Sequence, residues 1–163
     1  MLKKLILTLV LLAALPLVAQ AAARVSSIGP RFGFSVDPDQ LVVGGQLGIG
    51  PIAKDLTFDP NLELGFGDDV TVVALNMDMH YHLRVSDSDW RPYAGFGVGI
   101  NFISWDRPAP HMDGSDTEVG GNFIFGMEVP AGADSKFFGE LKLGLGDIPT
   151  LKILAGWNYP FGR

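Results

Sequence analysis

Apolar and polar residues alternate along most of the chain after its first two dozen positions. In the stretch 76–83, NMDMHYHL, the polar residues Asn76, Asp78, His80 and His82 occupy every second position, and Met, Met, Tyr and Leu stand between them. Successive side chains of a strand point to opposite faces, so this alternation predicts a β-strand with two chemically different faces. The same period recurs and predicts eight strands, at about 28–36, 40–50, 56–66, 70–83, 90–104, 117–129, 136–146 and 150–161.

The connections between these strands are short and rich in residues that favour turns. The longest is 106–116, DRPAPHMDGSD, and no stretch of the chain after the N-terminal region has the period of a helix. Eight alternating strands with short connections predict an up-and-down antiparallel meander, and closing it into a barrel removes both exposed edges. The predicted fold class is therefore all-β, an eight-stranded antiparallel up-and-down β-barrel.

The polar face of the predicted strands is unsuited to water. It consists mostly of Gly, Asn, Gln and Ser, with far fewer Lys and Glu than a solvent face carries. The narrow interior of eight strands cannot hold the many large side chains of the other face. We therefore expect a transmembrane β-barrel with its apolar face toward lipid and its polar face filling the lumen. The luminal charges, expected to form ion pairs, are Glu63, Asp78, Arg91, Glu118, Glu128, Glu140, Lys142 and Lys152.

Aromatic residues near the strand ends are typical of the girdles that mark the two interfaces of a bilayer. One predicted girdle consists of Phe66, Phe102 and Trp105, and the other of Phe58, Tyr81, Trp90, Phe137, Trp157 and Tyr159.

The N-terminal segment 1–23 has the pattern of a secretory signal peptide. Lys3 and Lys4 precede an apolar run, and small residues follow it at 19–23. The mature domain is then 24–163, with 10 basic residues after removal of these two lysines from 12, against 18 acidic residues. This balance argues against a nucleic-acid partner.

The chain contains no cysteine, which excludes disulfides and thiolate metal sites.

His80 and His82 raise the question of a metal site. Two imidazoles on one face of a strand lie about 7 Å apart, and Asp78 shares that face. A further ligand could come from another strand, from Glu63, Glu128 or Glu140. Two histidines without an identified third ligand are weak evidence, and the simpler interpretation is that both hydrogen-bond with neighbouring carboxylates. We accordingly predict no metal and no other cofactor.

Two stretches carry a resemblance to a known family: 91–99, RPYAGFGVG, and the closing strand 151–161, whose alternate apolar positions end at Phe161. They resemble the small outer-membrane β-barrels of Gram-negative bacteria, which include the OmpA membrane anchor and OmpX. The family usually ends on an aromatic residue read by the barrel-assembly machinery; here Pro160 interrupts the strand, and Gly162 and Arg163 follow the aromatic residue.

The resemblance implies a location and partners. It places a monomer in the outer membrane, in contact with lipid and lipopolysaccharide. Both termini are then periplasmic, and the connections 37–39, 67–69, 106–116 and 147–149 are extracellular. The function implied is a non-catalytic structural or surface-interaction role.

Two alternatives remain open from the sequence. A soluble periplasmic barrel would bind a small apolar ligand in its lumen. The second alternative is a lipid A-modifying enzyme. Lipid A deacylase barrels use a His-x-Ser pair, and the corresponding His-Tyr-His at 80–82 has no serine. Ser104 and Ser115 lie near one end with His111, but no spacing connects them. The loop acids Asp106, Asp113 and Asp116 suit a divalent cation or a surface partner, although acidic loops are usually only solvated.

Overall fold

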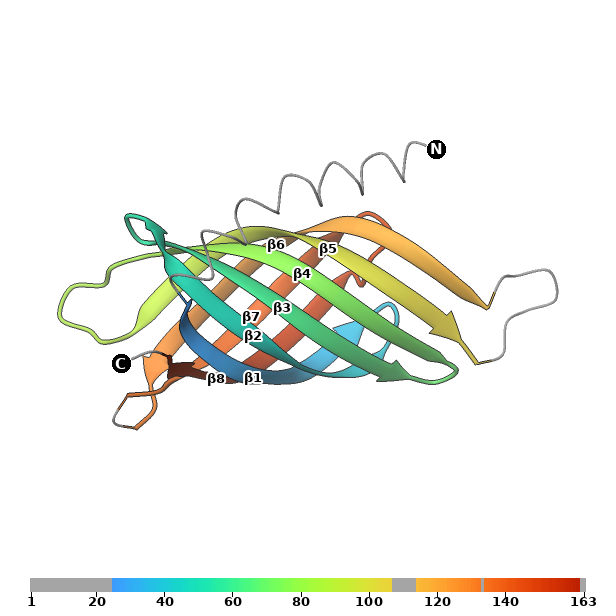
Figure 1. Cartoon of the computed structure of the whole chain (residues 1–163), viewed down its shortest axis with the longest axis horizontal. Helices are drawn as coiled ribbons and strands as arrows, with labels where there is room; N and C mark the ends of the chain where they lie inside the picture. Colours follow the sequence, from blue (N-terminus) through green and yellow to red (C-terminus); the bar gives the residue numbers. More distant parts are fainter. Residues whose placement is uncertain (1–24, 107–113, 133, 162–163) are drawn as a thin grey trace.

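Eight antiparallel strands close into a barrel in which every strand pairs with its neighbours in sequence order (Figure 1). The computed structural model describes residues 25–106, 114–132 and 134–161. Strand β1 also pairs with β8, so the described sheet has no free edge. All eight predicted strands are confirmed, as β1 (Val25–Val36), β2 (Gln40–Ala53), β3 (Leu56–Gly67), β4 (Val70–His82), β5 (Arg91–Trp105), β6 (Ser115–Pro130), β7 (Lys136–Leu145) and β8 (Leu151–Pro160).

The two ends of the barrel differ in their connections. The terminal end contains the start of β1 and the end of β8, where Ser27 pairs with Pro160, together with the connections 54–55, 83–90 and 131–135. The distal end contains the connections 37–39, 68–69, 106–114 and 146–150. Aspartate occupies the left-handed backbone region in four of these seven connections, at Asp37, Asp55, Asp69 and Asp87, with φ between 54° and 59°. Aspartate tolerates that conformation better than most residues, which accounts for its frequency in these turns.

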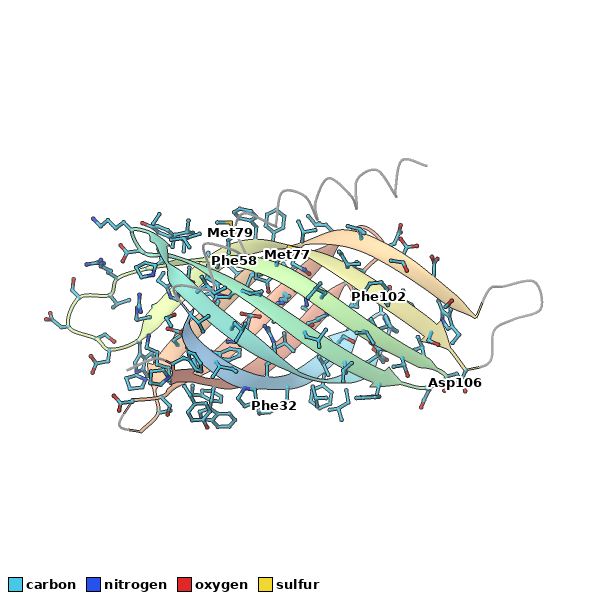
Figure 2. The ribbon with its side chains drawn as sticks, in the orientation of Figure 1. Phe32, Phe58, Met77, Met79, Phe102 and Asp106 are labelled. Atoms are coloured by element: carbon cyan, nitrogen blue, oxygen red, sulfur yellow. The ribbon has the colours of Figure 1, made fainter. Side chains whose placement is uncertain are left out.

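The outer face carries the large apolar side chains that the alternation assigned to it. Phe34, Phe96 and Phe123 are 64%, 60% and 51% exposed. Phe32 points away from the barrel wall in Figure 2. The exposed hydrophobic residues occur on all eight strands, whereas the alternate positions face the lumen and are mostly buried. No helix in the described ranges is long and apolar enough to cross a membrane.

Trp105 corrects one part of the aromatic assignment. It was expected in an outer girdle but lies on the luminal face, where it packs with Ile103 against Val70, Val72 and Ala74. β5 extends to Trp105 with unbroken pairing to β4, and the period of two then places residue 105 on the same side as residue 103. The girdle prediction for Trp105 was wrong because it relied on the closeness of Trp105 to the strand end. It did not consider which face of the strand the alternation assigns to residue 105.

The other girdle aromatics lie on the outer face. Phe58 departs from the expected exposure because it is buried against Ile49, with Met77 and Met79 packed beside it. Trp157 stacks on Phe32 at 6.0 Å and meets Phe137 edge-on at 5.1 Å between ring centroids. The exposed members are Phe66, Tyr81, Trp90, Phe102 and Tyr159.

Candidate functional site

The centre of the lumen holds a buried network of three cations and three carboxylates. Lys142 Nζ lies 2.6 Å from Asp78 Oδ2 and 3.3 Å from Glu63 Oε1. Lys152 Nζ lies 2.6 Å from the other oxygen of Glu63. None of these side chains is more than 5% exposed. The pairing offsets the cost of burying each charge, which would be very large for an isolated ion.

Arg31 completes the network from β1. Its guanidinium pairs with Glu140, and its Nε lies 3.2 Å from Glu63 Oε1. Tyr93 donates a 2.8 Å hydrogen bond to the second oxygen of Glu140. The Arg31 guanidinium also lies over the ring of Phe138, 5.8 Å from its centroid. Three positive and three negative groups therefore meet in a neutral, densely bonded layer.

Two asparagines extend this layer with neutral hydrogen bonds. Asn61 donates to Asp78 Oδ2 at 2.7 Å, and Asn76 donates to Asn61 Oδ1 at 2.9 Å. Such connected networks fix a single arrangement of side chains, because each broken bond leaves a buried polar atom without a partner.

His80 and His82 adjoin the ionic layer on its terminal side. His80 Nδ1 lies 3.4 Å from Asp59 Oδ2, and its Nε2 lies 3.7 Å from Glu140 Oε2. Its ring stacks on Tyr93 with 4.6 Å between centroids. His82 Nε2 lies 3.2 Å from Thr57 Oγ1. Both histidines thus face the lumen, as the alternation predicted, among oxygen atoms from β3 and β7.

The proposed metal ligands are not brought together. Asp78 and Glu63 are bonded to Lys142 in the ionic layer, whereas Glu128 accepts hydrogen bonds from Lys136 and Asn158. Glu140 approaches His80 but is paired with Arg31. In the part of the chain that the structure describes, no group of three or more His, Asp or Glu side chains is arranged to hold a metal ion.

The hydroxyl groups considered for catalysis lie far from these histidines. Ser104 and Ser115 face each other across β5 and β6 at the distal end, whereas His80 and His82 are in the terminal half of β4. Residues His111 and Asp113 lie outside the described residues. The backbone N–H of Asp106 donates to Asp69 O at 3.0 Å, and Asp116 accepts from the N–H of Thr117 at 2.7 Å.

The remaining predicted luminal charges lie nearer the barrel ends. Glu128 is buried, while Arg91 and Glu118 are partly exposed at the terminal and distal ends. Sequence reasoning missed Arg31, Asp59 and Phe138, which are buried in the lumen. The alternation could have identified Arg31 and Asp59 as luminal. Arg31 lies on the same face of its strand as Ser35, and Asp59 lies on the same face as Glu63. Phe138 could not be found this way, because its aromatic ring contradicts a polar face.

The distal half of the lumen contains a layer of apolar side chains among buried polar ones. Val42, Val72 and Ala74 are only 2%, 3% and 2% exposed although they lie on the luminal face. Ile148 enters from the distal turn, 7% exposed, and packs over the glycine at position 120. This apolar layer contrasts with the charged centre, so the lumen is chemically different along the barrel axis.

The terminal half opens into a vestibule, which we define as the cavity of about 570 Å³ at the terminal mouth. It is lined by residues of all eight strands and of three terminal connections, including Ser27, Thr57, Asp59, His82 and Arg91. The lumen is therefore accessible from the terminal end, and the apolar layer lies beyond the charged centre toward the distal end.

Solved structures of outer-membrane barrels share this architecture. The N-terminal β-barrel domain of Pseudomonas aeruginosa OprF superposes with a TM-score of 0.66, at 16% identity over 85% of this chain and 99% of that one. This chain has the fold of such barrels. Neisserial surface protein A gives a TM-score of 0.64 at 14% identity, over 83% of this chain and 95% of that one.

A third barrel, the Yersinia pestis outer membrane protein Ail, gives a TM-score of 0.52 at 9% identity, over 83% of this chain and 99% of its own. No protein-family model matches the sequence, and no curated protein matches it. At these identities the likeness establishes the fold.

Proposed function

We propose that this protein is a non-catalytic outer-membrane barrel with a structural or surface-interaction role. The observation that supports this proposal most strongly is that apolar side chains lie outside the barrel and charged side chains lie inside it. Large apolar side chains are exposed around the whole outer wall, whereas Arg31, Glu63, Asp78 and Lys142 are at most 1% exposed in the interior. Soluble proteins rarely expose an apolar surface this extensive, and lipid is the solvent that suits it.

Strand length agrees with this proposal. The eight strands contain 10 to 16 residues each, and about 9–11 tilted residues cross the hydrocarbon core of a bilayer. The closed ladder satisfies backbone N–H and C=O groups that hydrocarbon could not. A soluble ligand-binding barrel would require the opposite distribution of polar and apolar faces.

We propose the family orientation for this barrel, with the terminal end in the periplasm and the distal connections outside the cell. Residues 1–23 then act as the signal peptide, and the barrel-assembly machinery inserts the mature chain as a monomer among lipid and lipopolysaccharide. The charge distribution supports this orientation. Lys54, Arg84, Arg91 and Lys136 lie at the terminal end, whereas every charged residue in the described distal connections is acidic.

Membrane fractionation tests the proposed location. The barrel should stay with the outer membrane after a carbonate wash, and the unboiled folded protein should migrate differently from the boiled protein on a gel. Recovery of the protein in the soluble periplasmic fraction would contradict the proposal. Release of fatty acid from purified lipid A would instead support the deacylase alternative.

A further inference from the structure

The floor of the vestibule contains an acceptor without a partner. His82 lines the vestibule and is 5% exposed, yet its Nδ1 has no hydrogen-bond partner among the described residues. Thr57 donates its single hydroxyl hydrogen to Asp59. The contact between Thr57 Oγ1 and His82 Nε2 must then be donated by His82. In the neutral imidazole this leaves Nδ1 as a lone-pair acceptor, buried at the floor of the vestibule, which a donor bound there would satisfy.

Asp59 adds a carboxylate to the same floor. Its side chain is 11% exposed, and the one basic side chain within ion-pair distance of it among the described residues is His80, whose Nδ1 is 3.4 Å away. No described Lys or Arg side chain forms an ion pair with it. An ammonium group carries three N–H donors and a positive charge, so it matches both a carboxylate and an imidazole acceptor.

Two of the four described cations that line the vestibule are held in ion pairs. Arg84 Nη2 lies 2.7 Å from Asp55 Oδ1, and this guanidinium holds the pKa of the Asp55 carboxyl below its usual range. Lys136 Nζ lies 3.1 Å from Glu128 Oε2. Arg91 and Lys54 also line the vestibule, and neither has an ion pair to another described residue; Arg91 is the one on a strand beside His82.

The backbone spacing between His82 and Arg91 gives an approximate ligand length. His82 is opposite Tyr93 in the sheet, and Arg91 is two residues closer to the mouth than Tyr93. Two residues of a strand span about 7 Å. A ligand reaching from the floor to Arg91 therefore needs a positive group and a negative group separated by roughly that distance.

We propose that the vestibule binds a short zwitterionic peptide of dipeptide size. Its ammonium group sits among Asp59 and His82, and its carboxylate pairs with Arg91. The ends of an extended dipeptide are roughly 6 Å apart, from the backbone dimensions of a trans peptide. The volume of about 570 Å³ falls within the range of small-molecule sites, about 300–1,000 Å³.

Three matched probes test this site on the refolded full-length barrel by NMR titration. Glycylglycine should shift the resonances of Ser27 and Thr57 saturably. N-acetyl-glycylglycine lacks the ammonium and should not bind. Glycylglycinamide lacks the carboxylate and should bind about tenfold more weakly, because one charge-assisted contact is lost.

Variants locate the site. Asp59→Asn and Arg91→Gln should each weaken glycylglycine binding about tenfold, whereas Asp68→Asn at the distal end should not change it. Arg91 is partly exposed near the mouth, so its variant keeps the test valid if Asp59→Asn fails to fold. Equal responses to the three probes, the absence of saturable shifts, or unchanged binding by Arg91→Gln would overturn the proposal and leave a vestibule that holds only water.

Discussion

Single charged residues in the lumen each contact several partners on other strands. Lys142 is fully buried and contacts carboxylates of two other strands, Asp78 on β4 and Glu63 on β3. Each partner would be left with uncompensated charge if the ammonium were removed. The loss of stability on removing such a residue therefore comes mainly from leaving buried carboxylates unpaired, and less from losing the attraction between the paired charges.

Replacing Lys142 with methionine should lower the free energy of unfolding by roughly 3–5 kcal/mol, because it breaks a buried pair. Urea unfolding of the refolded barrel, followed by tryptophan fluorescence, measures this change. Lys54→Met in an exposed turn is the control and should shift stability by less than about 0.5 kcal/mol. A second substitution, Asp78→Leu, should recover part of the loss, and an unchanged midpoint for Lys142→Met would contradict the role assigned to the network.

The phase of individual residues was predictable, and their partners were not. The period of two placed Glu63, Glu140 and Lys142 in the lumen, and it would equally have placed Arg31. Which carboxylate meets which cation depends on the tilt and stagger of the strands, which have no local signal in the sequence. For this reason the sequence predicted that luminal charges form ion pairs, and the structure confirms this, but the sequence did not predict which side chains pair.

At the scale of strands, neighbouring glycines leave room for large luminal side chains. Gly126 is opposite Tyr93 on the adjacent strand, and a Cβ atom added there would lie 2.2 Å from Tyr93 Cζ. Tyr93 in turn reaches Glu140 and stacks on His80. Gly139 on β7 faces outward, and a Cβ atom there would meet nothing within 4 Å.

The substitution Gly126→Ala should destabilise the barrel by about 1–3 kcal/mol, since Tyr93 must leave its position. Gly139→Ala is the matched control and should be neutral or slightly stabilising, because alanine restricts the unfolded chain and here meets no obstacle. Urea midpoints of the two variants compare them directly. Equal midpoints would show that Tyr93 is not held against the backbone of β6.

Strand positions were the most predictable elements because alternation is a local property. The predicted ends fell within three residues of the observed ends, apart from details such as the extension of β5 that carries Trp105 inward. The burial of Val42, Val72 and Leu154 in the lumen was not predicted. Apolar residues on the nominally polar face break the pattern, and only the assembled barrel shows that they pack together or against neighbouring strands.

At the scale of the whole molecule, the outer wall behaves as a lipid-facing surface in the proposed location. Phe123 lies at the middle of β6 and is 51% exposed between Phe96 and Leu143 of the adjacent strands. Phe123→Arg should destabilise the barrel by roughly 2–4 kcal/mol in lipid vesicles, the cost of a cation near the bilayer midplane. Urea unfolding in vesicles measures it, with Asp87→Arg in a terminal loop as the control. No loss of stability would argue for a soluble barrel.

The two halves of the lumen should also differ in their access to water. The chain has no cysteine, so single cysteines can be introduced and labelled without background. Ser27→Cys in the vestibule should react with a small maleimide in the folded barrel, whereas Val72→Cys in the apolar layer should react only after unfolding in urea. Rapid labelling of both would show that water passes through the lumen.

The pairing between distant strands has a consequence for the order of events during assembly. Arg31 on the first strand meets Glu140, 109 residues later, and Lys152 on the last strand meets Glu63, 89 residues earlier. Contacts so remote in sequence form late, because the entropy of closing the intervening loop must be overcome first. Until the first and last strands join, these charges lack their partners and cannot enter hydrocarbon cheaply. In the proposed outer-membrane location, we therefore expect insertion of this chain to be coupled to closure of the barrel.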